Sequence, residues 1–227
     1  QAAPADVIAL KQFQDSFVDV ALEDLTVEGS IYAVPLYVDT LAFYYNKDFL
    51  NSANIAQPPA TWNDFLAAIP KLRKLGPTGS VERAAATIGA AKNINRSTDI
   101  AALLMMQSGT SIVDRKTRQV VIGETKNLSD GTPHRPGVEA LRFYTDFTDP
   151  LKGEAYTWGL SSNFHWSVDA FAEESAAMTF HYAYELPVFK QKNPNLRFGI
   201  AKMPQIQNRE RDINYANYWA PAVSFQS

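Results

Sequence analysis

The chain of 227 residues contains no cysteine. This absence excludes disulfide bonds, thiolate chemistry and cysteine-based zinc sites. A cysteine-free chain is compatible with a place outside the cytoplasm, but it does not establish one. The length is sufficient to bury a substantial core, in one large domain or in two small ones.

Long apolar runs and clusters of basic residues are also missing. Hydrophobic residues make up 46% of the chain and charged residues 20%, which is typical of a globular protein. No apolar run approaches the ~20 residues that a membrane-spanning helix needs. The formal net charge is −3, and Lys and Arg are scattered, so nucleic acid is not expected as a partner. No signal-peptide pattern is visible, and we expect any targeting segment to have been cut away or to lie outside this sequence.

Catalytic signatures are absent as well. The sequence contains no nucleophile elbow, no P-loop, no H-E-x-x-H motif and no dinucleotide-binding glycine pattern. Its histidines, His134, His165 and His181, lie far apart without the spacing of metal ligands. The pair Glu173-Glu174 is typical of a solvated helix end. We therefore expect no cofactor and no metal.

The most informative stretch that is present runs from Gly29 to Phe49, with the sequence GSIYAVPLYVDTLAFYYNKDF. Two segments rich in β-formers, 31–34 and 41–45, predict two strands. Pro35 cannot donate to a sheet ladder, so it should end the first strand and allow the second to join another sheet. Asp39 then lies at the crossing. A carboxylate in such apolar surroundings needs either a hydrogen-bond donor in a turn or a ligand, and both readings stay open.

Helical and strand patterns alternate along the rest of the chain. Thr61 to Asp64 predict a capped helix that continues until Gly76-Pro77 and that Pro70 should kink or shorten. Ser97, Thr98 and Asp99 can cap a helix over 100–107, and Pro136 can begin another. Further segments predict strands over 84–88, 176–180 and 198–201 and helices over 167–174 and 185–192. This order predicts an α/β fold with ligands at the carboxyl ends of the strands.

Aromatic rings and polar groups collect at the predicted strand ends and in the ring-rich loop 151–166. The candidate binding residues are Asp39, Asn93, Arg96, Trp158, Trp166, Tyr182, Tyr184, Glu185 and Trp219. Such a set suits a neutral polyol, because the C–H face of a sugar packs on a ring while amides and carboxylates bind its hydroxyl groups. The tyrosines after the strand 176–180 could equally be core aromatics under a helix.

Three sequence segments carry a family resemblance. The run IYAVPLYVDTLAFYYNKDFLNSANIAQPPATWNDFLAAIPKLRKL joins a Y-x-x-P-x-x-x-D crossing to Y-Y-N-K-D and P-P-x-T-W. The segments FAEESAAMTFHYAYELPVF and YANYWAPAVS follow further along the chain. Together they resemble extracellular solute-binding proteins of sugar ABC transporters, the group that includes maltose-binding protein.

The resemblance implies a two-lobed fold of the periplasmic-binding-protein type II kind, of which this chain is mainly the second lobe. It implies that the chain is a fragment lacking N-terminal and C-terminal parts. Residues 1–38 would then be a remnant of the first lobe, residues 39–217 the second lobe, and residues 218–227 the return crossing. Tyr184 matches the family's stacking aromatic and Asp39 its carboxylate on the first crossing, while Trp219 lies near the second crossing.

The same resemblance implies the function and the surroundings of the protein. It predicts a monomer that binds a sugar or oligosaccharide without catalysis and delivers it to the membrane permease of an ABC importer. It also implies a location in the periplasm or on the outer face of the membrane, where a lipid anchor could hold it. Two alternatives remain: a glycoside-acting enzyme that uses Asp39 and Glu185, and a binding protein for a peptide, polyamine or sugar phosphate.

Overall fold

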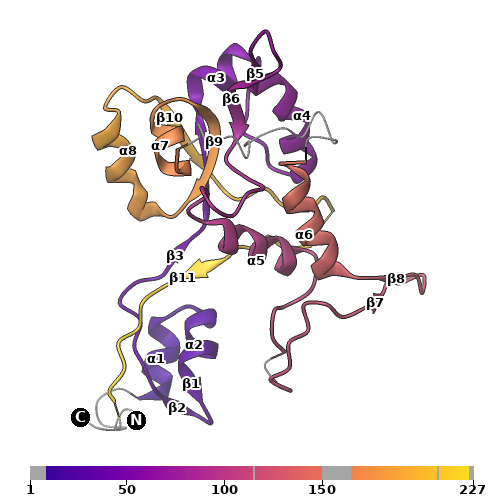
Figure 1. Ribbon diagram of the computed structural model, residues 1–227. Coiled ribbons are helices and arrows are strands. Elements are labelled where there is room, and N and C mark those ends of the chain that lie inside the picture. Colours follow the sequence, from indigo (N-terminus) through magenta and orange to yellow (C-terminus); the bar gives the residue numbers. More distant parts are fainter. Residues whose placement is uncertain (1–8, 115, 150–164, 209, 225–227) are drawn as a thin grey trace. The chain divides into compact units, whose positions relative to one another are not determined.

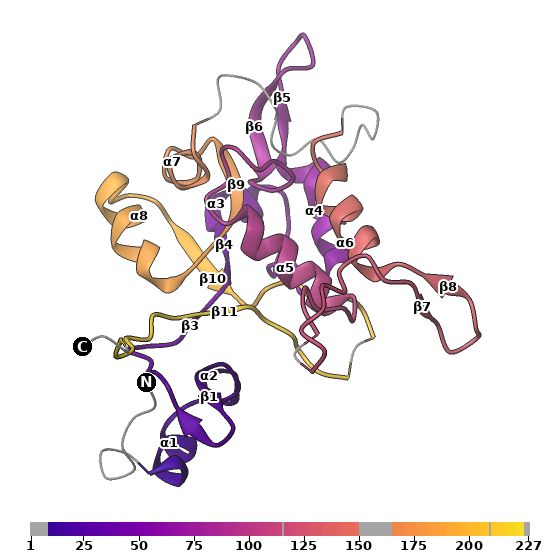
Figure 2. The ribbon, with the colours of Figure 1, turned by 60° about the horizontal axis from the view of Figure 1, so that its bottom comes forward.

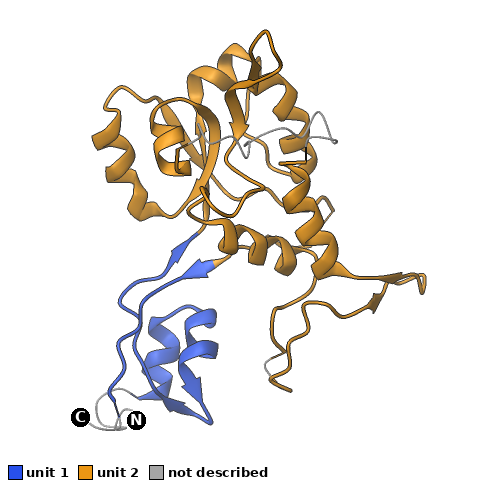
Figure 3. Ribbon diagram, viewed as in Figure 1, with its two compact units in different colours: residues 1–40, 216–227 blue, residues 41–215 orange. Residues whose placement is uncertain are grey.

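The computed structural model describes residues 9–114, 116–149, 165–208 and 210–224. It divides the chain into two compact units (Figure 3). Unit 1 contains residues 1–40 and 216–227, and unit 2 contains residues 41–215. The chain therefore passes between the units twice, and each unit is described by itself below.

Unit 2 is built on a five-stranded sheet in the order β10-β4-β9-β6-β5. Only the pair β6–β9 is parallel among these neighbours; the other three pairs are antiparallel. The strands are β4 (Ala42–Asn46), β5 (Lys74–Leu75), β6 (Val81–Ala86), β9 (Ala176–His181) and β10 (Phe198–Ala201). The sequence-based strand prediction is confirmed for β9 and β10, while β6 begins and ends earlier than expected.

Strand β4 shows why the sheet is covered on both faces. Its side chains alternate, as the pleat requires, so that Phe43 and Tyr45 pack in one apolar cluster and Tyr44 in another. Both Phe43 and Tyr44 are fully buried. A strand with rings on both faces must be central, and β4 lies between β10 and β9.

Helices pack on the two faces of this sheet (Figures 1 and 2). Helices α7 (Ser167–Ala172) and α8 (Leu186–Lys192) cover one face, where Phe171 and Phe189 pack on Tyr44. Helices α4 (Trp62–Leu72), α5 (Ser97–Gln107) and α6 (Pro136–Asp146) lie on the other. The larger of the two apolar clusters lies on that face and includes Phe65, Leu103 and Tyr144. The α/β class predicted from the sequence is confirmed.

Helix α4 starts as its sequence predicts. Thr61 and Asp64 form a reciprocal capping box, in which Asp64 N donates to Thr61 Oγ1 and Thr61 N donates to Asp64 Oδ2. The helix ends at Leu72, so the predicted end at Gly76-Pro77 is wrong, while the shortening expected from Pro70 agrees with this early end. Lys74 and Leu75 instead pair with β6 as strand β5, so sheet pairing overrides the helical pattern there.

The start of α5 also differs from its prediction. We expected residues 97–99 to cap a helix that begins at Ile100. The helix begins at Ser97 instead, and Arg96 takes the N-cap position without a side-chain cap bond. Asp99 therefore lies in the first turn, where a carboxylate is stabilised by the helix dipole and its side chain can bond elsewhere.

Other parts of unit 2 are peripheral to the sheet. Helix α3 (Lys47–Ser52) follows β4, and a short 3-10 turn, η2 (Ala183–Glu185), precedes α8. Between α5 and α6 the chain forms an extended arm that contains the bridge Val113–Val120 and the strands β7 (Lys126–Asn127) and β8 (Pro133–His134) (Figure 2). No helix in the described ranges is long and apolar enough to cross a membrane.

Unit 1 consists of short elements. They are α1 (Leu10–Ser16), α2 (Asp19–Leu25), β1 (Thr26–Val27), β2 (Ser30–Ile31), β3 (Asp39–Thr40) and β11 (Ala216–Asn217). The predicted strand over 31–34 is too long, since β2 stops at Ile31 and pairs only with β1. Beyond it, Ala33 forms an isolated bridge with Ala222. The second pairing joins β3 to β11, where Thr40 lies opposite Ala216.

Candidate functional site

The parallel strands β6 and β9 bring two distant segments to one edge of the sheet. Strand β6 ends at Ala86 and runs into the loop 87–96, while β9 ends at His181 and leads into the turn η2. Because the strands are parallel, their carboxyl ends meet at the same edge. Arg96 from the first segment and Tyr182, Tyr184 and Glu185 from the second come together there.

A third segment, the start of α7, joins the same edge. Ser167 N donates to the carbonyl oxygen of Asn93 at 2.9 Å, and Ser167 Oγ donates to Asn95 Oδ1 at 2.8 Å. Asn95 N in turn donates to Ser167 Oγ at 3.1 Å. These bonds place Trp166, the N-cap of α7, beside the loop that follows β6. We call this set the strand-end cluster; it consists of Asn93, Arg96, Trp166, Tyr182, Tyr184 and Glu185.

The two tyrosines of the cluster have different environments. Tyr182 is fully buried, and its hydroxyl donates to Asp99 Oδ2 at 2.9 Å. Burial, together with the charge of Asp99, raises the pKa of Tyr182 above its ordinary value, so it stays a neutral donor. Tyr184 is 45% exposed, and its ring stacks on that of Tyr182 with centroids 5.8 Å apart. Tyr182 is thus a core aromatic residue, whereas the ring of Tyr184 is open to solvent.

Arg96 lies beside both rings. Its guanidinium carbon is 5.4 Å from the centroid of each tyrosine ring, within the range of cation–π attraction. Arg96 Nη2 is 3.9 Å from Glu185 Oε1, which is an ion pair but too long for a hydrogen bond. Burial raises the pKa of Glu185, and the charge of Arg96 partly offsets that effect.

Beneath the cluster lies a buried polar layer that sequence reasoning did not assign to the site. His181 is fully buried, and its Nε2 is 3.4 Å from Ser167 Oγ. Burial, with a smaller contribution from the nearby charge of Arg96, lowers the pKa of His181 to about 3, so the ring is neutral. His181 Nδ1 and Arg96 Nε are buried side-chain atoms without a hydrogen-bond partner in the described part of the chain. Ser167 and Asp99 could have been suspected only as helix-start residues.

The remaining candidates lie elsewhere. Asp39 belongs to unit 1, where it pairs with Asn217 and its Oδ1 accepts from Thr40 N at 2.8 Å. Trp219 also belongs to unit 1 and is 72% exposed. Trp158 lies outside the described residues, as does most of the predicted ring-rich loop. The structure therefore brings together six of the nine candidates, and the role of each in binding stays a prediction.

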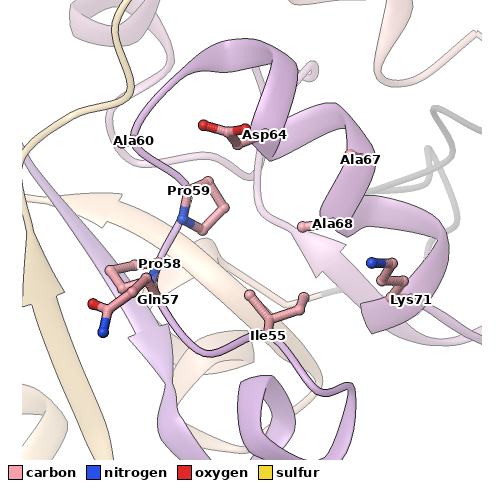
Figure 4. Close-up of a pocket in the computed structure, with 9 residues that line it drawn as sticks. All are labelled: Ile55, Gln57, Pro58, Pro59, Ala60, Asp64, Ala67, Ala68 and Lys71. Atoms are coloured by element: carbon pink, nitrogen blue, oxygen red, sulfur yellow. The ribbon is translucent and has the colours of Figure 1, made fainter.

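Two hollows in unit 2 contain none of the candidates. One of about 390 Å³ lies beside the start of α4, between the proline-containing segment and the helix, with Asp64 and Lys71 among its lining residues (Figure 4). Asp64 is already engaged in the capping box. The other, of about 300 Å³, lies where Trp62, Leu104 and Phe143 meet. Within the described ranges, no group of three or more acidic or histidine side chains could hold a metal ion.

Comparison with solved structures shows the fold that contains this site. A solute-binding protein of an ABC transporter from Thermotoga lettingae TMO, bound to α-D-tagatose, has a TM-score of 0.70 and 17% identity and matches 100% of this chain and 54% of its own. The maltose/maltodextrin-binding domain of Bdellovibrio bacteriovorus, bound to maltotriose, has a TM-score of 0.63 and 18% identity, with 100% and 53% covered. UgpB of Mycobacterium tuberculosis, in complex with glycerophosphocholine, has a TM-score of 0.64 and 18% identity, with 99% and 52% covered. The fold is that of two-lobed solute-binding proteins, and this chain matches about half of each.

Sequence comparison gives the family. The chain spans about half the length of the curated relatives it matches, for example 45% of Brucella binding proteins that are 27% identical over 89% of this chain. The model of the family described as bacterial extracellular solute-binding protein matches residues 1–224. Since this match covers nearly the whole chain, the protein belongs to the family of bacterial extracellular solute-binding proteins.

Proposed function

We propose that this chain is part of the substrate-binding component of an ABC importer and binds a sugar or oligosaccharide between two hinged lobes. The observation that carries the proposal is the strand-end cluster, in which exposed rings stand beside polar groups at the carboxyl ends of β6 and β9. Tyr184 and Trp166 are 45% and 54% exposed, which suits them to pack on the C–H face of a sugar. Tagatose and maltotriose in structures of this fold support the same ligand class.

The second half of the site is proposed to come from unit 1 and from the rest of the protein. Asp39 and Trp219 are the candidates there, and Trp158 is a further candidate from the loop. The crossings lie beside one another, since Leu41 N donates to Tyr215 O next to the Thr40–Ala216 pair. We infer that this double connection is the hinge, with residues 1–38 and 218–227 in one lobe and 39–217 in the other. A ligand that touches both lobes stabilises the closed form, so the 227-residue chain alone should bind weakly.

Catalysis is not part of the proposal, but one observation gives the enzyme alternative a specific form. The raised pKa of Glu185 is a property that a general acid in a glycosidase requires. The cause of the raised pKa is burial, which the charge of Arg96 partly offsets, and a partly buried carboxylate also suits the binding of hydroxyl groups. Incubation with chromogenic glycosides separates the two functions, because steady release of the chromophore would favour the enzyme.

The partners and the location of the protein are proposed from its role as the substrate-binding component of an ABC importer. The protein is expected to be a monomer that meets a membrane permease through polar surfaces of its lobes. It would act outside the cytoplasm, in the periplasm or on the outer face of the membrane, with a lipid anchor as one means of attachment. Size-exclusion chromatography with light scattering tests the monomer, and a stable dimer that buries Tyr184 would contradict it.

A thermal-shift screen of the intact protein tests the proposed function. A ligand that binds only the native state raises the melting temperature, by an amount that grows with its concentration over its dissociation constant. We expect at least one neutral sugar to do so, and peptides or polyamines not to. Asp39→Asn keeps the shape of the side chain while changing its acceptor pattern, so it should weaken sugar binding more than folding. A positive response only to peptides or polyamines would contradict the sugar assignment.

A further inference from the structure

We propose that Arg96 and Glu185 act as one recognition unit for two neighbouring hydroxyl groups on an uncharged sugar ring that lies against Tyr184. The inference rests on the proposed function and goes beyond it by naming the chemical feature of the ligand that is read. It makes the Arg96–Glu185 pair the specificity determinant of the cluster.

The distance between the Arg96 guanidinium and the Glu185 carboxylate leaves both groups able to bind a ligand. Arg96 Nη2 and Glu185 Oε1 are 3.9 Å apart, so the charges attract each other without a direct hydrogen bond. The Nη groups of Arg96 and the carboxylate oxygens of Glu185 thus keep hydrogen-bonding capacity that neither uses on the other. A guanidinium only donates and a carboxylate only accepts, whereas a hydroxyl does both. Neighbouring hydroxyls on a sugar can therefore satisfy the pair together, one accepting from Arg96 and the other donating to Glu185.

The charges around Arg96 and Glu185 favour an uncharged ligand. The groups that face Arg96 are the carboxylate of Glu185, the neutral rings of Tyr182 and Tyr184, and neutral His181, while Asp99 is held by the Tyr182 hydroxyl. An anionic ligand at Arg96 would face the carboxylates of Glu185 and Asp99. A cationic ligand at Glu185 would face Arg96. An uncharged ligand leaves the pair intact, so the cluster selects against charge of either sign.

The side chains of Arg96 and Glu185 are partly exposed and partly held by their neighbours. The side chains of Arg96 and Glu185 are 25% and 11% exposed, so each can reach a ligand while most of it stays fixed by neighbours. The adjacent Tyr184 ring is more exposed than either, and Tyr182 supports it from below. A ring of C–H groups on Tyr184 would place its edge hydroxyls toward Arg96 and Glu185. Rigid placement of both reading groups is what specificity of this kind needs.

The experiment is a calorimetric titration of the intact protein in two stages. Neutral sugars (D-glucose, D-mannose, D-galactose, D-tagatose, maltose and cellobiose) are tested first. The tightest binder is then compared with its uronic acid, its amino sugar and its deoxy derivatives. We expect the charged derivatives, and one deoxy derivative of a neighbouring pair, to bind at least tenfold more weakly than the neutral parent.

Variants test the two residues. Arg96→Met and Glu185→Gln should each weaken binding of the neutral sugar at least tenfold, and the double variant should lose less than the product of the two. Arg96→Lys, which keeps the charge but not the guanidinium fork, should also bind more weakly, and its melting temperature without ligand checks the fold. The matched control is the exposed ion pair Arg197–Asp48, whose Nη1–Oδ1 distance is 2.9 Å. Arg197→Met and Asp48→Asn should leave affinity within twofold.

The outcomes distinguish this inference from the proposed function. Tighter binding of a uronate or an amino sugar than of its neutral parent would overturn the inference and leave sugar binding in place. The inference would also be overturned, with sugar binding left in place, if Arg96→Lys and Glu185→Gln bound the neutral sugar within twofold of the unsubstituted protein. If no sugar binds the intact protein at all, the proposed function fails, and the inference fails with it.

Discussion

Tyr182 and Asp99 are 83 positions apart in sequence, yet the Tyr182 hydroxyl donates to Asp99 Oδ2 at 2.9 Å. The bond ties the first turn of α5 to the residue that follows β9. Tyr182 also stacks on Tyr184, so the exposed ring rests on a buried one whose position is fixed at both ends. The relationship separates a buried, supporting tyrosine from an exposed one.

Alanine substitution of the two tyrosines should give opposite results. Tyr184→Ala removes an exposed ring, so sugar affinity should fall roughly ten- to a hundredfold with little change in the ligand-free melting temperature. Tyr182→Ala empties a fully buried site and should cost about 3–5 kcal/mol of folding free energy. Calorimetric titration and urea unfolding measure the two effects. A large stability loss in Tyr184→Ala with unchanged affinity would reverse the assignment.

Acid should destabilise unit 2 through His181. Its pKa in the folded protein is about 3, below the ordinary value of about 6.5, so under acid the unfolded chain binds the extra proton. The stability from a neutral ring is complete above about pH 6.5 and falls as the pH decreases toward 3, by at most about 1.4 kcal/mol per pH unit. In His181→Gln this loss should vanish. The difference in unfolding free energy between the parent protein and the variant should therefore be smaller at pH 5 than at pH 7.5. Urea unfolding at both pH values checks it, and a constant difference would argue against a buried neutral ring.

Asn46 should be essential for the junction between β4 and α3. It is fully buried; its Oδ1 accepts from the backbone N–H groups of Asp48 and Phe49 at 2.9 and 3.0 Å, and its Nδ2 donates to Glu174 Oε1 at 2.9 Å. Asn46→Ala loses a cap and leaves partly buried hydrogen-bonding groups unpaired, at a cost of about 2 kcal/mol in unfolding free energy.

Asn46→Asp provides the matched test of this junction. It keeps the cap acceptor but places a carboxylate against Glu174, so it should also destabilise the protein. Adding Glu174→Gln should restore much of the loss, because the new amide can donate to the aspartate. Thermal unfolding of the single and double variants decides the question, and full stability of Asn46→Asp alone would show that the Glu174 contact contributes little.

Gly199 on β10 should tolerate no side chain while Tyr45 is present. The two residues are paired across the strands, and a Cβ on Gly199 would overlap the Tyr45 ring. Gly199→Ala should therefore cost about 1–3 kcal/mol through overpacking. In the background of Tyr45→Ala the same change should cost much less, which a double-mutant cycle in urea measures. Equal costs in both backgrounds would show that the ring moves aside freely.

The sequence by itself determined the local features of this protein. The β-formers of Ala42–Asn46, with rings at three consecutive positions, specify a strand buried on both faces. Thr61 and Asp64 specify the start of α4, because both cap bonds lie within four residues. The family motifs likewise placed the chain correctly, since they are continuous stretches of residues.

Only the tertiary structure decided what the candidate residues do to one another. The parallel pairing of β6 with β9 brings Arg96 beside residues almost ninety positions away, and no local pattern encodes that neighbourhood. It also decided that Tyr182 is buried and Tyr184 exposed, although both are tyrosines two positions apart. Helix α4 ends early for the same reason, since Lys74 and Leu75 pair with β6. Periodicity reports which local conformation a segment favours, whereas burial and charge environment depend on contacts that form only when distant segments pack.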